Sequence, residues 1–365
     1  MEKKSSNSNL HKANKAKKDE FYTQLVDIEK ELKHYKEQFK DKVVYCNCDD
    51  PFESNFFKYF ASNFNALGLK RLIATSYKPS PIANTQLGLF GDDKTLEIKG
   101  RPKTNANKFI INEVHDFDGD GVFDLRDIAE QLKANKNNEW SPLKGDGDFR
   151  NQESLELLKQ ADIVVTNPPF SLFIEYFIQL IDNNKKFLII GNKNAVKYNA
   201  VFKEIKNNKC WLGYNTPKEF IIPDGSITKK VQGLTRWFTN LEVEKHKNDI
   251  VLYKKYSYKE YPKYDNFDAI EIGKEKKDGG WEGRVDIIPM DYEGVMGVPI
   301  TFIDKYNPEQ FTILGIFDDK REDDEAFIKG GATFVDEQHK KYVGPVLKGK
   351  ALYTRVLIKN KKPQK

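Results

Sequence analysis

Residues 161–173, ADIVVTNPPFSLF, place an amide, two prolines and an aromatic ring directly after a short apolar run. The apolar run has the composition of a buried strand. Adjacent prolines lack backbone donors and stiffen the chain where the strand ends, and the residue before a proline is kept out of the helical region. The pattern therefore predicts that the amide of Asn167 and the ring of Phe170 are held rigidly at the tip of a buried strand.

This arrangement suits chemistry on an exocyclic aromatic amine, such as that of adenine, whose delocalised lone pair makes the nitrogen a poor nucleophile. The side-chain oxygen of Asn167 and the carbonyl oxygen of Pro168 can each accept one amine hydrogen, which localises the lone pair and offsets the charge that develops on nitrogen. Pro169 keeps the backbone stiff, and Phe170 can stack on a base that has left its duplex. The alternative is a strand-terminating turn with a core phenylalanine.

The elements that must position these residues alternate along the first half of the chain. Strands are expected over 42–48, 70–77, 108–114, 161–166 and 185–192, and helices over 19–40, 53–68, 124–135, 153–160 and 172–183. Alternation of this kind predicts parallel pairing and a doubly wound, Rossmann-like α/β sheet. In such a sheet, ligands bind beyond the carboxyl ends of the strands, where the strand order reverses.

The second part of the chain differs in composition and in hydrophobic periodicity. From about residue 210 the helical periodicity fades, and tyrosines and lysines crowd together, as in YKKYSYKEYPKY at 253–264. Short strands over 311–317 and 351–359 are bounded by turn residues. We therefore expect a disordered basic arm over 1–18, an α/β domain over 19–215 and a mixed, β-rich region over 216–365.

Charge and cysteine content narrow the class of protein. The formal net charge is +5, and residues 1–18 carry six lysines against one glutamate. This arm is either a solubilising terminus or a loose contact with nucleic-acid phosphate, and it lacks the apolar segment of a secretory signal. Cys46, Cys48 and Cys210 form neither a disulfide framework nor, with five histidines, a zinc set. The first two are expected as small buried residues, and a cytoplasmic location is predicted.

Several long segments carry a resemblance to the EcoRI-type adenine-specific DNA methyltransferases, which use S-adenosylmethionine. They are DEFYTQ, VVYCNCDDPFESNFFKYF, GDFRNQESLELLKQADIVVTNPPFSLF, FLIIGNKNA, RWFTNLE, YPKYDNFDAIEI and MDYEGVMGVPITFIDKYNP, between Asp19 and Lys359. The resemblance implies that residues 167–170 are the catalytic motif, acting on a flipped adenine in double-stranded DNA. It also implies that residues 216–365 form the target-recognition region.

The resemblance further implies a pocket for S-adenosylmethionine. The residues implied are Tyr22 and Thr23 near the methionine portion, Asp49, Asp50 and Pro51 in the first-strand motif, and Asp148 and Phe149 near the adenine of the cofactor.

The first-strand motif departs from the general pattern of methyltransferases. A glycine-rich loop is expected after the first strand, whereas this chain has CNCDDPFES, without a glycine. Asp49 and Asp50 can also be explained as caps of the helix that follows.

A separate acidic segment, DFDGDGVFDLRD at 116–127, has the spacing of a calcium loop. Its candidate ligand positions are Asp116, Asp118, Asp120, Gly121, Asp124 and Asp127. The last position lacks the bidentate glutamate, and a strand rather than a helix is expected before the loop. An acidic turn whose aspartates cap the next helix is the alternative; we favour it and assign no metal site.

Two rival functions stay open. The first is a methyltransferase that acts on RNA or on a protein amide, against which the length and composition of the second region argue. The second is a catalytically weak or inactive DNA-binding protein on a methyltransferase fold, against which the intact tetrad argues. We expect a monomer that binds double-stranded DNA, and a cognate restriction endonuclease, where one exists, that acts on the same site without a stable complex.

Overall fold

The computed structural model describes residues 22–48, 54–77, 106–116, 119, 127, 137–221, 227–228, 233–277, 280–317, 334–335, 341–342 and 344–364. The chain forms two compact units. Unit 1 comprises residues 1–195 and 213–242, and unit 2 comprises residues 196–212 and 243–365. The division expected at 215/216 therefore falls inside unit 1, because strand β11 (Thr235–Thr239) pairs with β7 (Lys186–Asn192).

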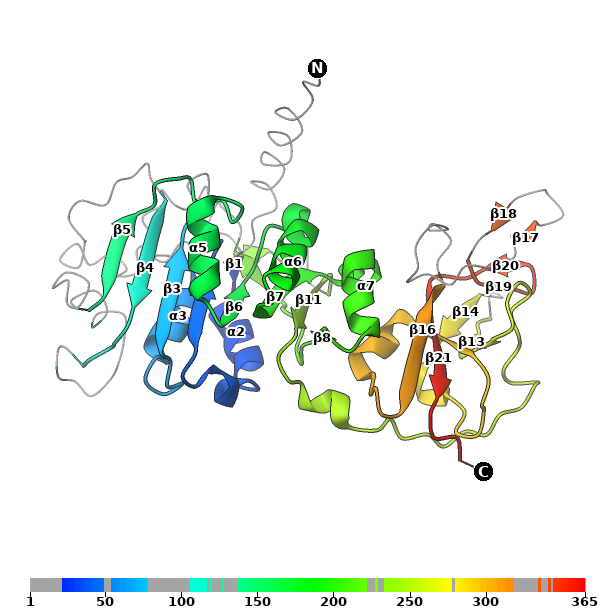
Figure 1. Cartoon of the computed structure of the whole chain (residues 1–365). Coiled ribbons are helices and arrows are strands. Elements are labelled where there is room, and N and C mark those ends of the chain that lie inside the picture. Colours follow the sequence, from blue (N-terminus) through cyan, green and yellow to red (C-terminus); the bar gives the residue numbers. More distant parts are fainter. Residues whose placement is uncertain are drawn as a thin grey trace, which may run out of the picture. The chain divides into compact units, whose positions relative to one another are not determined.

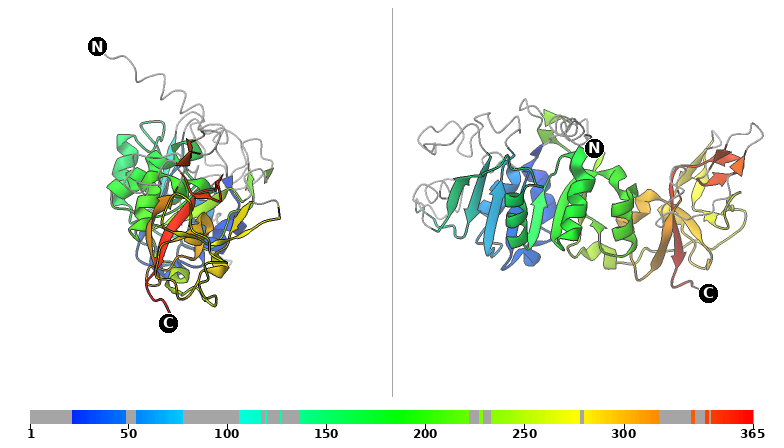
Figure 2. Two further views of the ribbon diagram at one scale, coloured as in Figure 1. Left: turned by 90° about the vertical axis from the view of Figure 1, so that its right-hand side faces the viewer. Right: turned by 45° about the horizontal axis from the view of Figure 1, so that its top comes forward.

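Unit 1 is built on a large mixed sheet (Figure 1). The strands of this sheet that belong to unit 1 follow the order β5-β4-β3-β2-β6-β7-β11. The strands not yet given are β2 (Val43–Cys46), β3 (Arg71–Thr75), β4 (Asn107–Ile111), β5 (Glu139–Pro142) and β6 (Ile163–Thr166). The four central strands, β3, β2, β6 and β7, are parallel. They can be followed side by side in the right-hand view of Figure 2.

The expected parallel pairing holds for the central strands but not for the strands that flank them. Strand β4 is antiparallel to β3, β5 is antiparallel to β4, and β11 is antiparallel to β7. Burial alternates along β4, which is typical of a strand with one partly covered face. The helix expected over 124–135 lies almost wholly outside the described residues.

The α-helices in the described parts of unit 1 are α2 (Leu25–Leu32), α3 (Asn55–Ser62), α5 (Gln152–Gln160) and α6 (Phe173–Asp182). Of these, α2 and α3 are clearly shorter than predicted, whereas α5 and α6 lie close to their predicted ranges. The helix expected over 19–40 is interrupted at Tyr35, whose backbone (φ −120, ψ 6) leaves the helical region before the 3-10 helix Lys36–Phe39. Figure 1 shows α5 and α6 in front of the sheet. Gly191 of β7 lets α6 pack closely, because a Cβ there would lie 2.3 Å from the Phe173 ring.

The strand order reverses at β2. This strand pairs with β3 on one side and with β6 on the other, with Val44 opposite Ile163 and Tyr45 opposite Val164. The carboxyl ends of β2 and β6 are therefore adjacent at the point where ligands bind in open α/β sheets.

A small antiparallel sheet completes unit 1. It contains β1 (Tyr22–Thr23), β9 (Phe220–Ile221) and β10 (Ile227–Thr228), with β9 in the middle. The segment that bears the expected N-terminal motif is thus paired to a strand about 200 residues away along the chain.

Unit 2 is β-rich. Its largest sheet has the order β12 (Ile270–Glu271), β15 (Met296–Pro299), β21 (Arg355–Asn360) and β16 (Phe311–Phe317). Hairpins β13 (Gly273–Glu275) with β14 (Trp281–Gly283), and β19 (Val346–Leu347) with β20 (Lys350–Ala351), accompany it, as does helix α7 (Asn199–Lys206). None of the helices in the described parts of either unit is long and apolar enough to cross a membrane.

Candidate active site

The tetrad at 167–170 links β6 to α6 in unit 1. Thr166 ends the strand and is fully buried, Pro168 is buried, and the other members of the tetrad are partly buried. Pro169 is extended (φ −53, ψ 127), and its carbonyl oxygen accepts a hydrogen bond from Leu172 N at 2.9 Å. The expected rigid turn at a strand tip is therefore present, and the side-chain oxygen of Asn167 is buried within it.

Asn47, immediately beyond β2, connects the tetrad to its surroundings. Its carbonyl oxygen accepts a hydrogen bond from Thr166 Oγ1, and its Oδ1 accepts one from Tyr176 OH of α6. All three side chains are buried, with 3% exposure for Asn47 and none for the other two. The ends of β2 and β6 and the helix after the tetrad are thereby joined by buried hydrogen bonds, which rigidify a site when every group is satisfied.

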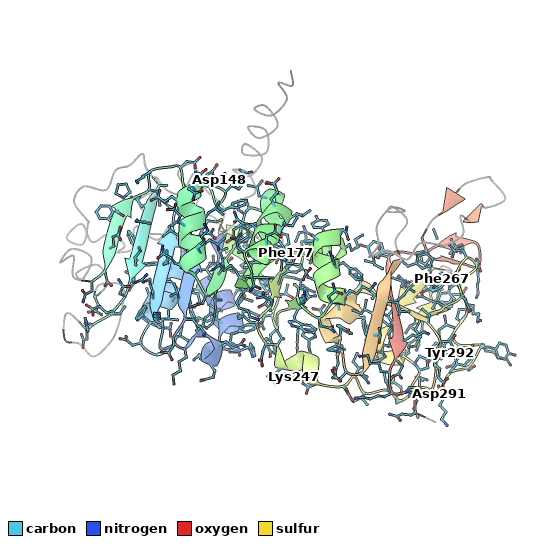
Figure 3. The ribbon with its side chains drawn as sticks, viewed as in Figure 1. Asp148, Phe177, Lys247, Phe267, Asp291 and Tyr292 are labelled. Atoms are coloured by element: carbon cyan, nitrogen blue, oxygen red, sulfur yellow. The ribbon has the colours of Figure 1, made fainter. Side chains whose placement is uncertain are left out.

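Asp148 is held by its neighbour Arg150. Arg150 Nε and Nη2 donate to Asp148 Oδ1 and Oδ2 at 2.9 and 2.6 Å, and Arg150 Nη1 donates to Glu175 Oε2 of α6 at 3.1 Å. Burial alone would raise the pKa of Asp148, but the hydrogen bonds and charge of Arg150 outweigh burial, so this pKa is lowered. The carboxylate is therefore ionised and fixed in orientation near the N-terminal end of α5 (Figure 3).

The segment before Asp148 requires a glycine. Gly147 has φ 79, and a Cβ at this position would lie 1.9 Å from the carbonyl oxygen of Ser76, just beyond β3. The backbone at Gly147 therefore passes close to Ser76, and this close contact fixes the position of the backbone that leads into Asp148.

Phe149 is packed into the same region. Its ring is 5% exposed and meets the Tyr176 ring edge-on, with centroids 5.0 Å apart. The guanidinium carbon of Arg150 lies 5.2 Å from the Phe149 centroid, and the Phe149 carbonyl oxygen accepts from Gln179 Nε2 at 3.0 Å. Phe149, Tyr176, Asn47 and Thr166, the residue before the tetrad, thus form one connected set, which the separate motifs did not predict.

Thr23, a further residue expected at the cofactor pocket, lies in β1 beside the start of α3. Its carbonyl oxygen accepts a hydrogen bond from Asn55 Nδ2 at 2.8 Å, at the start of α3. Thr23 is 3% exposed, and its Oγ1 has no hydrogen-bond partner among the described residues; the same holds for Gln24 Nε2. Buried polar atoms of this kind call for a polar partner. The backbone of Tyr22 is paired in β1, and nothing is described of its side chain.

Two carboxylates of α2 hold the segment that pairs with β1. Asp27 Oδ2 accepts from Lys218 N at 2.7 Å, and Glu31 accepts from Tyr214 N and Asn215 N at 2.8 and 2.7 Å. Burial raises the pKa of Glu31, and these hydrogen bonds counter part of the increase. The sequence analysis did not predict this clamp. Glu31 lies one turn from Ile28 and from Tyr35, on the apolar face of α2, and an acidic residue on an apolar face indicates a buried carboxylate that needs a hydrogen-bond donor.

Some expected residues are outside the described parts of the chain. Asp49, Asp50 and Pro51 are among them, as is most of the 116–127 segment. Where this segment is described, Asp116 Oδ1 accepts a hydrogen bond from Gly119 N at 2.7 Å, the geometry of the turn alternative. No group of three potential metal ligands from His, Cys, Asp and Glu occurs in the described ranges.

A mixed α/β sheet with an Asn-Pro-Pro-Phe turn after one of its central strands is consistent with a methyltransferase fold, and comparison with known proteins shows the family. The family model described as adenine-specific methyltransferase EcoRI matches residues 9–361. The Type II methyltransferase M.EcoRI of Escherichia coli is 44% identical, with 100% of both chains covered. M.MpnI of Mycoplasma pneumoniae is 35% identical over 96% of this chain and 98% of that protein.

A further relative, M.MgeORF184P of Mycoplasma genitalium, is 37% identical over 84% of this chain and 85% of its own. No solved structure matches the chain. The chain therefore belongs to the EcoRI family of adenine-specific methyltransferases. The family and enzyme class predicted from the quoted segments are confirmed.

Proposed function

We propose that the protein moves a methyl group from S-adenosylmethionine to the exocyclic amino nitrogen of a flipped adenine in double-stranded DNA. The observation that carries this proposal is the network around Asn47. It ties the catalytic turn after β6 to the end of β2, where the first-strand cofactor motif begins. The methyl acceptor and the methyl donor would thus be handled at adjacent strand ends.

We assign the fold of unit 1 to the doubly wound, Rossmann-like methyltransferase class. The support is the parallel core β3-β2-β6-β7, with its order reversing at β2. The antiparallel strands β4, β5 and β11 extend this core without altering the adjacent carboxyl ends.

The residues of the tetrad act on the amine. S-adenosylmethionine, when bound, supplies an electrophilic methyl group. Asn167 Oδ1 and the Pro168 carbonyl oxygen accept the two amine hydrogens, which localises the lone pair on nitrogen and stabilises the positive charge that develops there. Phe170 covers one face of the base, and the buried Thr166 and the extended Pro169 keep the acceptors in place.

The pocket for S-adenosylmethionine is proposed beside these strand ends. Thr23 Oγ1 and Gln24 Nε2 fit a polar ligand because both are buried and lack partners among the described residues. Asp148 is ionised, and its Oδ2 accepts one hydrogen bond among the described residues, from Arg150. A carboxylate oxygen can accept a second, so it suits the amino group of the cofactor's adenine. Asp49, Asp50, Pro51, Tyr22 and Phe149 stay predictions for this pocket.

Unit 2 is proposed to hold DNA. In the segment 253–264, Tyr253 and Tyr258 are 60% and 75% exposed. The Lys259 ammonium lies 6.0 Å from the Tyr258 ring centroid, so charge and an aromatic face are offered together. This combination suits contact with phosphate and stacking on sugar or base.

Two other tyrosines of this segment are structural. Tyr261 OH donates to Ile287 O at 2.8 Å, and Tyr264 OH donates to the buried Glu271, which is paired with Arg355. The lysine–tyrosine pattern therefore serves two purposes, and we assign only its exposed members to DNA.

The experiment is modification-aware sequencing of DNA from a methylation-free host that expresses the protein. N6-methyladenine within one sequence context is expected. Unmodified DNA in cells that contain folded protein would favour the inactive DNA-binding alternative, and modified RNA with unmodified DNA would favour the RNA alternative.

A further inference from the structure

Cys48 has a backbone conformation that its residue type does not explain. Its φ is 68, in the left-handed region. Residues with a Cβ are strained there, and Asn and Asp tolerate it best. The other non-glycine residues with positive φ in the described parts of the chain are Asp41, Asn137, Asn184, Asn208 and Lys348.

Those other positions are ordinary. Four of the five are Asn or Asp, and Lys348 precedes Gly349 in the tight turn between β19 and β20. Cys48 is neither an amide or acid nor part of such a hairpin. A strained backbone persists where the surrounding structure holds it in place, and such outliers cluster at functional sites.

The surroundings of Cys48 do hold it. The preceding residue, Asn47, is fixed at its carbonyl oxygen by Thr166 and at its side chain by Tyr176. Cys46, one residue earlier, is the last residue of β2 and is fully buried. The backbone that leads into Cys48 from the strand side is therefore fixed by buried residues.

This position is where a methyltransferase is expected to have glycine after its first strand. We propose that Cys48 performs the backbone role of that glycine: its left-handed conformation fixes how the backbone leaves β2. Cys48 then replaces the missing glycine with a residue of the same backbone conformation, and the Asn47 network offsets the strain of that conformation. The inference rests on the proposed function for its link to S-adenosylmethionine, but its backbone part does not.

The backbone part is tested by exchanging Ala and Gly at two cysteines two residues apart. All four variants remove a thiol, so thiol chemistry cancels within each pair. In the strand at Cys46, glycine should be less stable than alanine, because glycine loses more backbone entropy. At Cys48 the order should reverse, because glycine adopts positive φ without strain. We expect a Tm difference of roughly 2 °C within each pair, with opposite signs.

The functional part is tested by calorimetry with S-adenosylmethionine. Cys48→Gly should retain the cofactor affinity of the native chain, whereas Cys48→Val should weaken it by on the order of tenfold, because a β-branched residue resists the left-handed region. Cys46→Ala is the matched control and should bind like the native chain.

The outcomes separate the proposal from the function on which it rests. If alanine is the more stable residue at both positions, or if Cys48→Gly binds as weakly as Cys48→Val, the glycine role is wrong. If the native chain itself does not bind S-adenosylmethionine, the proposed function fails, while the Tm order at Cys46 and Cys48 still decides whether the turn is a glycine-like one.

Discussion

The two units hold their candidate functional side chains in different ways. At the strand ends of unit 1, Asn47 and Tyr176 are buried and hydrogen-bonded to one another. In unit 2, Tyr253 and Tyr258 project from the surface with 60% and 75% exposure. Buried side chains with fixed positions suit a reaction that depends on exact distances between atoms. Exposed side chains suit DNA binding, in which many residues each contribute a small part of the affinity. Substitutions in unit 1 should therefore change the rate at saturating substrate, and those in unit 2 should change DNA affinity.

The largest effect is expected for Asn167→Ala. Turnover should fall by ~10²-fold or more, because a preorganised acceptor for the target amine is lost. Cofactor affinity, measured by calorimetry, should stay near that of the native chain. Asn63→Ala is a suitable control, since Asn63 is a partly buried asparagine at the end of α3. Near-native turnover of Asn167→Ala would contradict the assignment.

Phe170→Ala should have the next largest effect. Stacking on a base is worth about 1–3 kcal/mol, so roughly a tenfold loss of catalysis is expected, together with a smaller population of flipped base. Phe170→Trp should be partly active, because an aromatic face survives. Fluorescence of 2-aminopurine at the target position reports the flipped population. Equal behaviour of the two variants would rule out stacking as the role of Phe170.

Tyr176→Phe tests the hydrogen-bond network around Asn47 in unit 1. The variant leaves Asn47 Oδ1 without the donor from Tyr176, at a cost of about 1–3 kcal/mol, and should weaken S-adenosylmethionine binding several-fold by loosening the turn after β2. Tyr261→Phe in unit 2 removes a comparable buried hydroxyl, which donates to Ile287 O at 2.8 Å. It should lower Tm without altering cofactor affinity. Equal cofactor affinities in the two variants would show that the Asn47 network does not support S-adenosylmethionine binding.

In unit 2 we expect smaller effects on DNA binding. Lys259→Ala should weaken DNA affinity a few-fold for all sequences, and it should reduce the salt dependence of log Kd by about one phosphate contact. Glu260→Ala, at the exposed neighbouring position, is the control. If the salt slope is the same for native protein and Lys259→Ala, this part of the segment does not face DNA phosphate.

The smallest expected effect concerns the clamp of α2. Burial raises the pKa of Glu31 above its usual value of 4.5. A raised pKa in the folded state gives a stability contribution that is complete below the unfolded pKa and is lost as pH rises through the folded pKa. The fall in Tm between pH 4 and pH 7 should therefore be smaller in Glu31→Gln than in the native chain. An unchanged pH profile would show that Glu31 is not the titrating group.

The sequence predicted the elements whose signal is local. The apolar runs of β6 and β7 and the periodicity of α6 lie close to their expected bounds. Strand β5, with the sequence EWSP, was not predicted, because its residues are mostly polar and only partly buried. Such a strand forms because β4 offers an unpaired edge, which no local pattern reveals.

The candidate site likewise has features that local sequence predicts and features that only the fold determines. The tetrad could be proposed from the sequence because its four residues are consecutive. The bonds of Asn47 to Thr166 and Tyr176 join residues 119 and 129 positions apart, and they depend on β2 lying beside β6. Cys48 was expected to be a small buried residue, whereas it is partly exposed and its backbone is the informative feature. Backbone conformation of this kind is set by the fold and not by residue type.

We propose that unit 1 performs the chemistry and that unit 2 holds the DNA. Single-turnover methyl transfer, measured at saturating cofactor together with DNA Kd, tests this division of roles on two variants: Asn167→Ala and the double variant Tyr253→Ala with Tyr258→Ala. Asn167→Ala is expected to lose ~10²-fold in rate while keeping DNA and cofactor affinity. The double variant is expected to bind DNA more weakly but to reach the native rate when DNA is saturating. A double variant that stays slow at saturating DNA, or an Asn167→Ala whose loss is recovered by adding DNA, would contradict this division of roles.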